Sequence, residues 1–270
     1  MLHHKFYSSN KPSNQLLIML HGFISDGSTF DSHIDTLTKQ VNVLTVDLPG
    51  HGNDDSPMDQ EWNFSYISQQ LDQILSEYHQ YHQYHQYLLG YSMGGRVSLY
   101  YALHGTNELS GLILESTSPG IQKEEDQIER QQVDNARAKV LEIAGLEIFV
   151  NDWERLPLFA SQYDLDKSVK KQIRQNRMNQ DPSKLAKALR DYGTGQMPNL
   201  WPSLINIQIP TIILAGQKDE KFVNIAQKMN EQIINSRKTI VSEVGHTIHV
   251  EDSAEFDTII LGFLKEEQND

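Results

Sequence analysis

The sequence predicts an α/β protein with a mostly parallel, doubly wound sheet and a helical cap inserted between core strands. Short apolar runs alternate with segments of helical length through the first 120 residues, and the alternation resumes after Trp201-Pro202. The runs are apolar throughout, which is typical of strands buried on both faces of a parallel sheet. Strands and helices that alternate in this way favour the doubly wound arrangement.

The strand and helix patterns can be placed along the chain. The predicted strands are residues 16–20, 41–46, 87–89, 112–114, 211–215 and 238–241, and the helices between and after them include residues 65–78, 95–103 and 254–265. Several strands end at a glycine or a polar residue, as His21-Gly22 and Gly90 do. These polar ends matter because ligands of open α/β sheets bind at the carboxyl ends of the strands.

Residues 121 to about 200 differ from the rest of the chain. They are rich in charge, show helical periodicity and contain no convincing strand. We expect helices over residues 121–144 and 166–192, with a break and a new helix start at Asp181-Pro182-Ser183. The sequence therefore predicts a core of residues 1–119 and 203–270, and a cap of residues 120–202 over the ends of the strands.

Composition excludes several classes of protein. The 270 residues include 23 Lys and Arg, 36 Asp and Glu and no cysteine, and 38% are hydrophobic, which is enough for a large core. The net charge of −13 argues against nucleic-acid and anionic-membrane partners. Without cysteine there is no disulfide, thiolate nucleophile or Cys-ligated metal. No run reaches signal-peptide form or the ~20 residues that span a bilayer, so we expect a cytoplasmic monomer or weak homo-oligomer.

A Tyr-His-Gln repeat fills residues 78–87 and brings three histidines to three-residue spacing. No carboxylate or structural context completes a metal site there. We interpret the repeat as a polar surface loop before the strand at Tyr87, and we expect no bound metal.

Gly90-Tyr91-Ser92-Met93-Gly94 follows an apolar strand and precedes a helical pattern. This is the G-x-S-x-G sequence in a strand–turn–helix context, which exposes the serine hydroxyl above the sheet. The alternative is a glycine-rich turn in which Ser92 only caps the helix. Ser92 is the candidate nucleophile or base.

A serine hydroxyl needs a histidine to accept its proton and a carboxylate to orient that histidine. Asp219 follows the strand at 211–215, and His246 follows the strand at 238–241, in the order that this fold requires. Glu220 and His249 are weaker candidates, because neither directly follows the strand turn.

Two backbone N–H groups are candidates for stabilising an oxyanion: that of Met93 after the serine, and that of Phe23 in the loop after the first apolar strand. The other loop at this edge contains His51, which we interpret as structural. Arg96 lies one helical turn after Ser92, on the same helix face. A guanidinium there suits a bound carboxylate, whereas the alternative is a surface arginine.

Outside the cap, HGF at residue 21, DLPGHG at residue 47, GYSMGG at residue 90, the late Asp and the late Gly-His together resemble the α/β-hydrolase superfamily. That fold hosts many chemistries. GYSMGGR at residue 90, ERQQVD at residue 129, Asp152-Trp153 with LFAS at residue 158, and GQKDEKF at residue 216 resemble, more narrowly, the 2-succinyl-6-hydroxy-2,4-cyclohexadiene-1-carboxylate synthase family of menaquinone biosynthesis.

The resemblance implies a lyase that removes pyruvate from 2-succinyl-5-enolpyruvyl-6-hydroxy-3-cyclohexene-1-carboxylate, without a metal or organic cofactor. It implies that the tricarboxylate substrate is bound by Arg96, Arg130, Arg174, Tyr91 and Trp153. Arg177 is the alternative to Arg174, because the cap aligns poorly there. Two other classes stay open: a serine carboxylic-ester or C–C bond hydrolase with the same triad, and a non-catalytic binding protein of this fold.

Overall fold

The computed structural model describes residues 1–82 and 84–266 and has a seven-stranded sheet in the order β1-β3-β2-β4-β5-β6-β7. Only β1 is antiparallel to its neighbour; the other pairs are parallel. The strands are β1 (His4–Tyr7), β2 (Gln15–Leu20), β3 (Asn42–Val46), β4 (His85–Tyr91), β5 (Gly111–Glu115), β6 (Thr211–Gly216) and β7 (Ser236–Val241). The expected parallel α/β sheet is confirmed.

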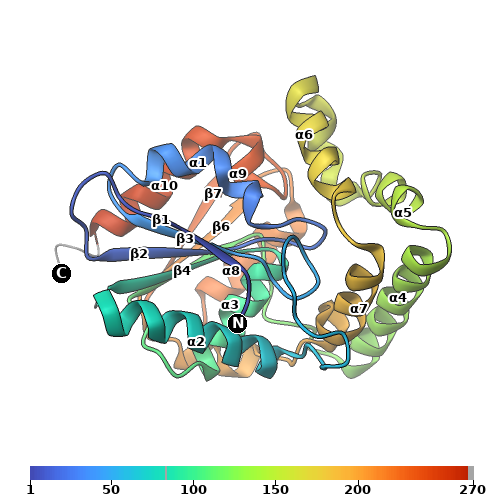
Figure 1. The fold of residues 1–270 in the computed structure, drawn as a ribbon, viewed down its shortest axis with the longest axis horizontal. Helices are drawn as coiled ribbons and strands as arrows, with labels where there is room; N and C mark the ends of the chain where they lie inside the picture. The colour runs from blue at the N-terminus through green and yellow to red at the C-terminus, as the bar shows by residue number, and fades with distance from the viewer. Residues whose placement is uncertain (83, 267–270) are drawn as a thin grey trace.

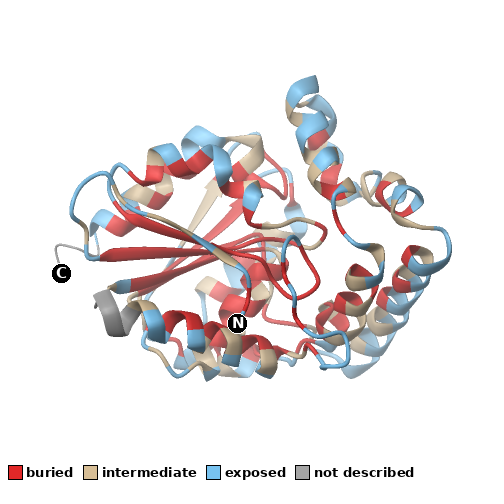
Figure 2. Cartoon of the chain, viewed as in Figure 1, coloured by how far each residue is buried: buried red, intermediate tan, exposed pale blue. Residues whose placement is uncertain are grey.

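Helices cover both faces of the sheet (Figure 1). One face carries α1 (Asp31–Leu37), α9 (Ile248–Glu251) and α10 (Ser253–Glu266), and the other carries α2 (Phe64–His82), α3 (Met93–His104) and α8 (Glu220–Asn230). Along β2, Leu16 and Ile18 join the apolar cluster on the α2–α3 side, and Leu17 and Met19 join the one on the α10 side. Figure 2 shows the central strands buried throughout, which explains their unbroken apolar sequence.

Four helices between β5 and β6 lie to one side of the sheet: α4 (Glu124–Ile143), α5 (Leu146–Trp153), α6 (Lys167–Met178) and α7 (Pro182–Tyr192) (Figure 1). Short 3-10 turns, Pro157–Asp164, Thr194–Gln196 and Trp201–Asn206, connect them to each other and to the sheet. They have their own apolar cluster, which includes Leu141, Phe149 and Leu185. We use the name cap for residues 120–202; that division remains a proposal.

The expected surface loop over the Tyr-His-Gln repeat was wrong. The backbone of α2 stays helical through His82, and β4 already begins at His85. Tyr78 stacks on Phe6 of β1 with ring centroids 5.3 Å apart, and the buried Gln86 side chain donates to the carbonyl of Leu75 over 2.7 Å. The repeat therefore packs against the core at both ends. The side chains of residues 79–83 lie outside the described residues.

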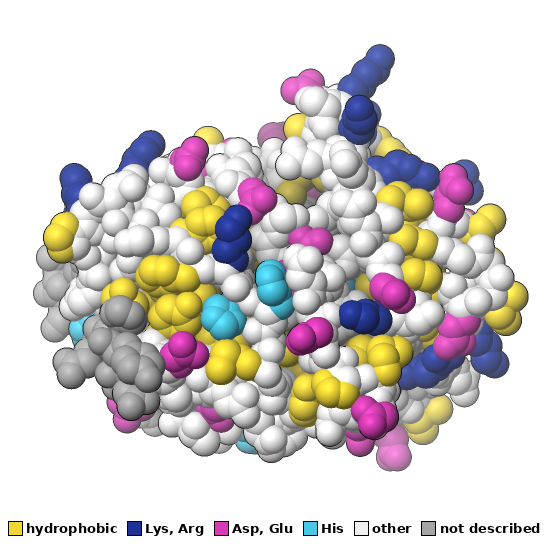
Figure 3. Space-filling view, in the orientation of Figure 1, with side chains coloured by type: hydrophobic (Ala, Val, Ile, Leu, Met, Phe, Trp, Pro, Cys, Tyr) yellow, Lys and Arg dark blue, Asp and Glu magenta, His cyan; other side chains and the backbone are white. Residues whose placement is uncertain are grey.

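Three further observations concern metal ions, membranes and charged partners. No group of three or more His, Asp or Glu side chains in the described part of the chain is arranged to hold a metal ion. In that same part, none of the helices combines the length and apolarity needed to cross a bilayer. On the face drawn in Figure 3, acidic and basic side chains are interspersed rather than gathered into one basic patch.

Helix α3 approaches the sheet closely because two positions, Gly90 near the end of β4 and Gly94 in the first turn of α3, have no side chain. A Cβ on Gly94 would overlap the backbone carbonyl of Leu20 in β2, and one on Gly90 would overlap the carbonyl of Gly94. The N–H of Gly94 also donates to the carbonyl of His21 over 3.0 Å. The glycines of the G-x-S-x-G sequence are therefore required by packing as well as by the turn.

We expect Gly94→Ala to lower the free energy of unfolding by about 1–3 kcal/mol, since the added methyl meets backbone that cannot move aside. The matched control is Gly262→Ala in the exposed face of α10, where nothing lies within 4 Å of the added Cβ. Alanine should stabilise that helix by roughly 0.5–1 kcal/mol. Urea unfolding measures the change in the free energy of unfolding for both variants, which should be opposite in sign. A Gly94→Ala protein as stable as the wild type would contradict the packing argument.

Candidate active site

Ser92 occupies a strained turn between β4 and α3. Its φ is 51°, in the left-handed region that a non-glycine residue rarely adopts. Its N–H donates to the carbonyl of Glu115 in β5 over 2.9 Å, which holds the turn in place. The hydroxyl makes no capping bond to α3, contrary to the capping alternative. The turn therefore presents the Ser92 hydroxyl to the space above the sheet.

His246 lies within hydrogen-bond distance of both Ser92 and Asp219. Its Nε2 is 3.1 Å from the Ser92 Oγ, and its Nδ1 is 2.7 Å from the Asp219 Oδ2. The other carboxylate oxygen of Asp219 accepts the N–H of Phe222 at the start of α8. This arrangement fixes the imidazole with Nε2 toward the serine.

The weaker candidates lie elsewhere. His249 is buried with Glu115, and its Nδ1 lies 2.9 Å from that carboxylate while its Nε2 lies 3.1 Å from the Thr29 hydroxyl. Glu220 is the first residue of α8, and Asp219 rather than Glu220 meets His246. His51 is buried against Tyr192, and burial lowers the pKa of His51 to about 3, so it is neutral. The structural interpretation of His51 fits this burial.

The two expected oxyanion donors both line the cavity beside Ser92: Phe23 lies in the loop after β2, and Met93 is the first residue of α3. Neither the N–H of Phe23 nor that of Met93 donates to another group within residues 1–82 and 84–266. The loop that carries the Phe23 N–H is held by the next residue, Ile24. Ile24 has a φ of 57° and its side chain packs in the apolar cluster of the cap. Free N–H groups beside a nucleophile are what an oxyanion requires.

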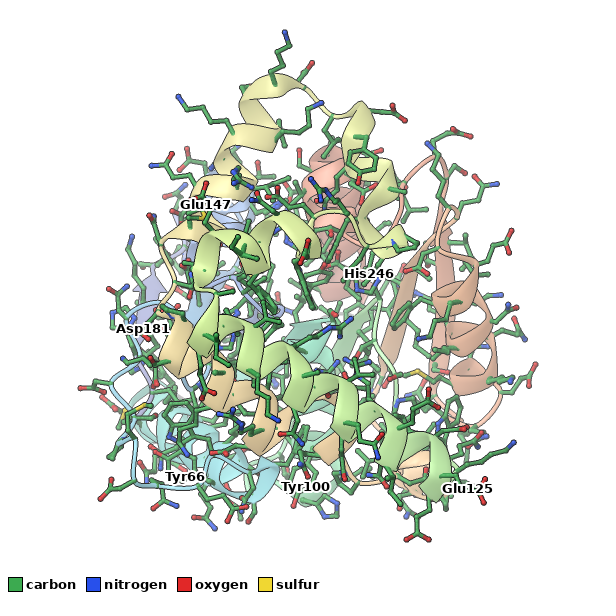
Figure 4. All side chains as sticks on the ribbon, turned by 90° about the vertical axis from the view of Figure 1, so that its right-hand side faces the viewer. Tyr66, Tyr100, Glu125, Glu147, Asp181 and His246 are labelled. Atoms are coloured by element: carbon green, nitrogen blue, oxygen red, sulfur yellow. The ribbon has the colours of Figure 1, made fainter. Side chains whose placement is uncertain are left out.

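A cavity of about 690 Å³ lies under the cap and opens onto Ser92, His246 and Asp219. In Figure 4, which faces the cap, the labelled His246 lies close to the cap helices. Although the chain is acidic overall, five Lys and Arg side chains line this cavity against two carboxylates. The basic residues are Arg96, Arg130, Arg137, Lys218 and Lys221, and the acidic ones are Asp219 and Glu220. The cavity therefore suits an anion.

Arg96 has no anionic partner of its own. Its Nε is buried without a hydrogen bond, and no carboxylate in the described chain lies within ion-pair distance of its guanidinium. Burial, and then the neighbouring Arg130, lower the pKa of Arg96 to about 10, so that it stays charged at neutral pH. A half-buried guanidinium with a buried, unbonded Nε and no carboxylate within ion-pair distance favours a bound anion.

Arg130 and Arg137 share one carboxylate on α4. Asp134 is buried and accepts the Nε–H of Arg130 over 2.9 Å, while Arg137 lies 3.8 Å away. Burial lowers the pKa of Arg137, and Arg130 adds to the effect. Two guanidinium groups on one carboxylate leave positive charge facing the cavity.

Trp153 and Tyr91 lie at the cavity wall, as expected. Trp153 stacks on Phe149 with ring centroids 5.5 Å apart, and Arg137 lies 5.3 Å over its ring. Its Nε1 is buried without a partner in the described structure. The hydroxyl of Tyr91 lies 2.8 Å from that of Thr247, and burial raises the pKa of Tyr91 far above its ordinary value.

Arg174 does not reach the cavity, contrary to the expectation for a substrate-binding residue. Its guanidinium is held over 2.8 Å by Glu154 and over 2.8 Å by the Asn151 side chain. Arg177, the alternative, is buried beneath Phe159 and shares Glu154, so it does not line the cavity either. Arg137 is the third arginine at the cavity, and sequence reasoning missed it. The sequence could have indicated it, because Arg137 lies two helical turns after Arg130 and this spacing places both arginines on one face of α4.

Comparison with known proteins agrees with this geometry. Residues 15–253 match the model of the α/β hydrolase fold family. A structure described as MenH from S. aureus superposes with a TM-score of 0.97 at 61% identity, covering 99% of this chain and 100% of that one. An esterase from Thermogutta terrifontis has a TM-score of 0.82 at 21% identity over 98% of this chain and 93% of its own, which shows the shared fold alone.

Two sequence relatives extend the likeness. A Yersinia pseudotuberculosis (serotype O:3, strain YPIII) protein named 2-succinyl-6-hydroxy-2,4-cyclohexadiene-1-carboxylate synthase is 30% identical over 93% of this chain and 87% of its own length. A Bacillus subtilis (strain 168) protein, whose name gives the same activity provisionally, is 33% identical over 93% of this chain and 91% of its own. The chain therefore belongs to the α/β-hydrolase fold family and, within it, to the 2-succinyl-6-hydroxy-2,4-cyclohexadiene-1-carboxylate synthases.

Proposed function

We propose that this protein eliminates pyruvate from 2-succinyl-5-enolpyruvyl-6-hydroxy-3-cyclohexene-1-carboxylate to give 2-succinyl-6-hydroxy-2,4-cyclohexadiene-1-carboxylate in menaquinone biosynthesis, in the cytoplasm. The observation that carries the proposal is the arginine-lined cavity beside the Ser92–His246–Asp219 chain. A neutral ester has no need of such a cavity, whereas a tricarboxylate does. The S. aureus and Yersinia relatives support the same activity.

In this proposal Ser92 is the base. His246 accepts the hydroxyl proton at Nε2, and Asp219 stabilises the resulting imidazolium through Nδ1. The activated Ser92 oxygen removes the proton next to the succinyl carbonyl of the substrate. The N–H groups of Phe23 and Met93 stabilise the enolate oxygen that forms, as they would an acyl oxyanion.

The electron pair then moves into the ring, and the bond between the ring carbon and the enolpyruvyl oxygen breaks. The leaving enolate of pyruvate takes up a proton and becomes pyruvate, and the proton that His246 accepted makes up the balance, which restores the neutral imidazole. The overall reaction is an elimination without hydrolysis. The base, the oxyanion donors and the cations all come from this chain, and no step requires a metal or organic cofactor.

The cations bind and orient the substrate in this proposal. Arg96 lies one turn beyond Ser92 and has no competing partner, so a substrate carboxylate can take both arms of its fork. Arg130 and Arg137 line the same cavity from the cap. Holding the carboxylates on two elements fixes the reacting carbon against Ser92, which is the purpose of such contacts. Trp153 and Tyr91 form the adjoining wall.

A serine hydrolase is the second candidate. The distances from Ser92 to His246 and from His246 to Asp219, with two free N–H groups nearby, equally suit acyl transfer to the serine. The two reactions differ in one observable, since only the hydrolase forms a covalent intermediate on Ser92.

We expect the purified protein to release pyruvate from the tricarboxylate without any mass increment on Ser92 during turnover. Ser92→Ala should lower the rate by about 10⁴-fold or more and still bind substrate, since binding depends chiefly on the arginines. Coupled detection of pyruvate, intact-protein mass spectrometry and calorimetric titration measure the three quantities. A substrate-derived adduct on Ser92 would favour the hydrolase, and an active Ser92→Ala protein would remove Ser92 from the mechanism.

We expect Arg96→Ala to lower kcat/KM for the tricarboxylate by at least about tenfold, because a charge-assisted contact contributes on the order of 1.5–3 kcal/mol. Arg96→Lys should recover only part of the loss, since an ammonium cannot replace the planar fork. Hydrolysis of a small neutral ester is the control and should change far less. Equal losses with both substrates would instead show that Arg96 supports the turn at Ser92.

A further inference from the structure

A chain of buried hydrogen bonds connects the cap to both sides of the catalytic site. The Arg177 guanidinium on α6 donates to the Gln162 Oε1 over 3.1 Å, and the Gln162 Nε2 donates to the Thr247 Oγ1 over 3.0 Å. The Thr247 Oγ1 lies 2.8 Å from the Tyr91 hydroxyl. All four side chains are buried, with exposed fractions of 6–7%.

The last two members of this series of hydrogen bonds are sequence neighbours of the reacting groups. Thr247 follows His246 directly, and Tyr91 precedes Ser92 directly. The Tyr91 ring also packs against the imidazole of His246, with ring centroids 5.5 Å apart. A shift of the Thr247 hydroxyl would therefore change the surroundings of both His246 and Ser92.

The loop that carries His246 is held from its other side by one carboxylate. Glu251 accepts the N–H of Gly245 over 2.6 Å and the N–H of Thr247 over 3.1 Å. These bonds fix the backbone around His246 but do not involve the Thr247 side chain. Only Gln162, among the described residues of the cap, makes a hydrogen bond to that side chain.

Gln162 is suited to this position by its chemistry. The position between Arg177 and Thr247 requires one acceptor and one donor on a single rigid group, which an amide provides. The charged Arg177 donates to the Gln162 Oε1 and so fixes which way the amide faces. The same Arg177 is held by Glu154 over 3.3 Å, which anchors the arrangement in the cap. Gln162 does not line the cavity, so it acts without touching the substrate.

We propose that Gln162 is a positioning residue that couples the cap to the catalytic serine and histidine through Thr247 and Tyr91. The inference rests on the proposed function for its substrate, but the hydrogen bonds themselves serve any reaction of this triad. Buried polar networks of this kind specify one arrangement when every member is satisfied.

The test compares Gln162→Met, which keeps the length of the side chain but removes both hydrogen bonds, with Thr247→Val, which removes the hydroxyl without changing the shape. We expect each to lower kcat about tenfold with KM changed less than about twofold, because neither group lines the cavity. The double variant should lose no more than the more affected single variant, since both interrupt one chain. Gln162→Glu should recover most of kcat, because its carboxylate accepts from both Arg177 and the Thr247 hydroxyl.

Gln86→Met is the matched control: Gln86 is also buried, bonds the carbonyl of Leu75 and lies at the far end of β4. It should lower the melting temperature about as much as Gln162→Met while kcat changes less than twofold. A Gln162→Met protein with wild-type kcat, or single losses that multiply in the double variant, would overturn the proposal. If Gln162→Met does not fold, Thr247→Val alone decides between the same outcomes.

The reaction used keeps this test separate from that of the proposed function. Pyruvate release by the wild-type protein tests the function, whereas the ratio of variant to wild-type rates on p-nitrophenyl acetate tests the hydrogen-bonded chain alone. If the wild-type protein releases no pyruvate, and the variants still hydrolyse the ester about tenfold more slowly than the wild type, only the proposed function is contradicted. Pyruvate release unaffected by either substitution would contradict only the role of Gln162.

Discussion

The close contact between α3 and the sheet is the constraint on which the site depends. Because Gly90 and Gly94 have no side chains, the helix starts directly above the ends of β2 and β4. That start places Ser92 in its strained turn, leaves the Met93 N–H free, and brings Arg96 to the cavity one turn later. The nucleophile, one oxyanion donor and one anion-binding group are thus set by a single packing contact.

The cap contributes the remaining charge. Its helices add Arg130 and Arg137 to a cavity that already holds Arg96, and these two cap arginines share one buried carboxylate, Asp134. Desolvated like charges oppose folding, so this arrangement costs stability in the ligand-free protein. In the proposed function, the bound tricarboxylate neutralises these charges and offsets that cost.

The core of the site could be predicted from the sequence because its signals are local. Ser92 lies within one strand–turn–helix pattern, and Asp219 and His246 each follow a strand whose end the sequence marks. The third arginine was missed because cap helices meet through tertiary packing: whether Arg174 or Arg137 faces the cavity depends on Glu154, which takes the former. β1 and the end of α2 were missed for a similar reason, since Phe6 and Tyr78 stabilise each other across the chain.

The claim that Arg96 is an unpaired cation held for a substrate carboxylate can be tested without substrate. Burial lowers the pKa of Arg96 in the folded protein below its ordinary value, so the charged form opposes folding at every pH below about 10. Arg96→Met keeps much of the side-chain volume and removes the charge. We therefore expect the free energy of unfolding of the ligand-free protein at pH 7 to increase by on the order of 1–2 kcal/mol. The melting temperature should then rise by about 2–6 °C. Arg155→Met, which removes an exposed arginine 3.9 Å from Asp152, should leave it unchanged. A lower melting temperature for Arg96→Met would show that Arg96 stabilises the fold, and would contradict the account.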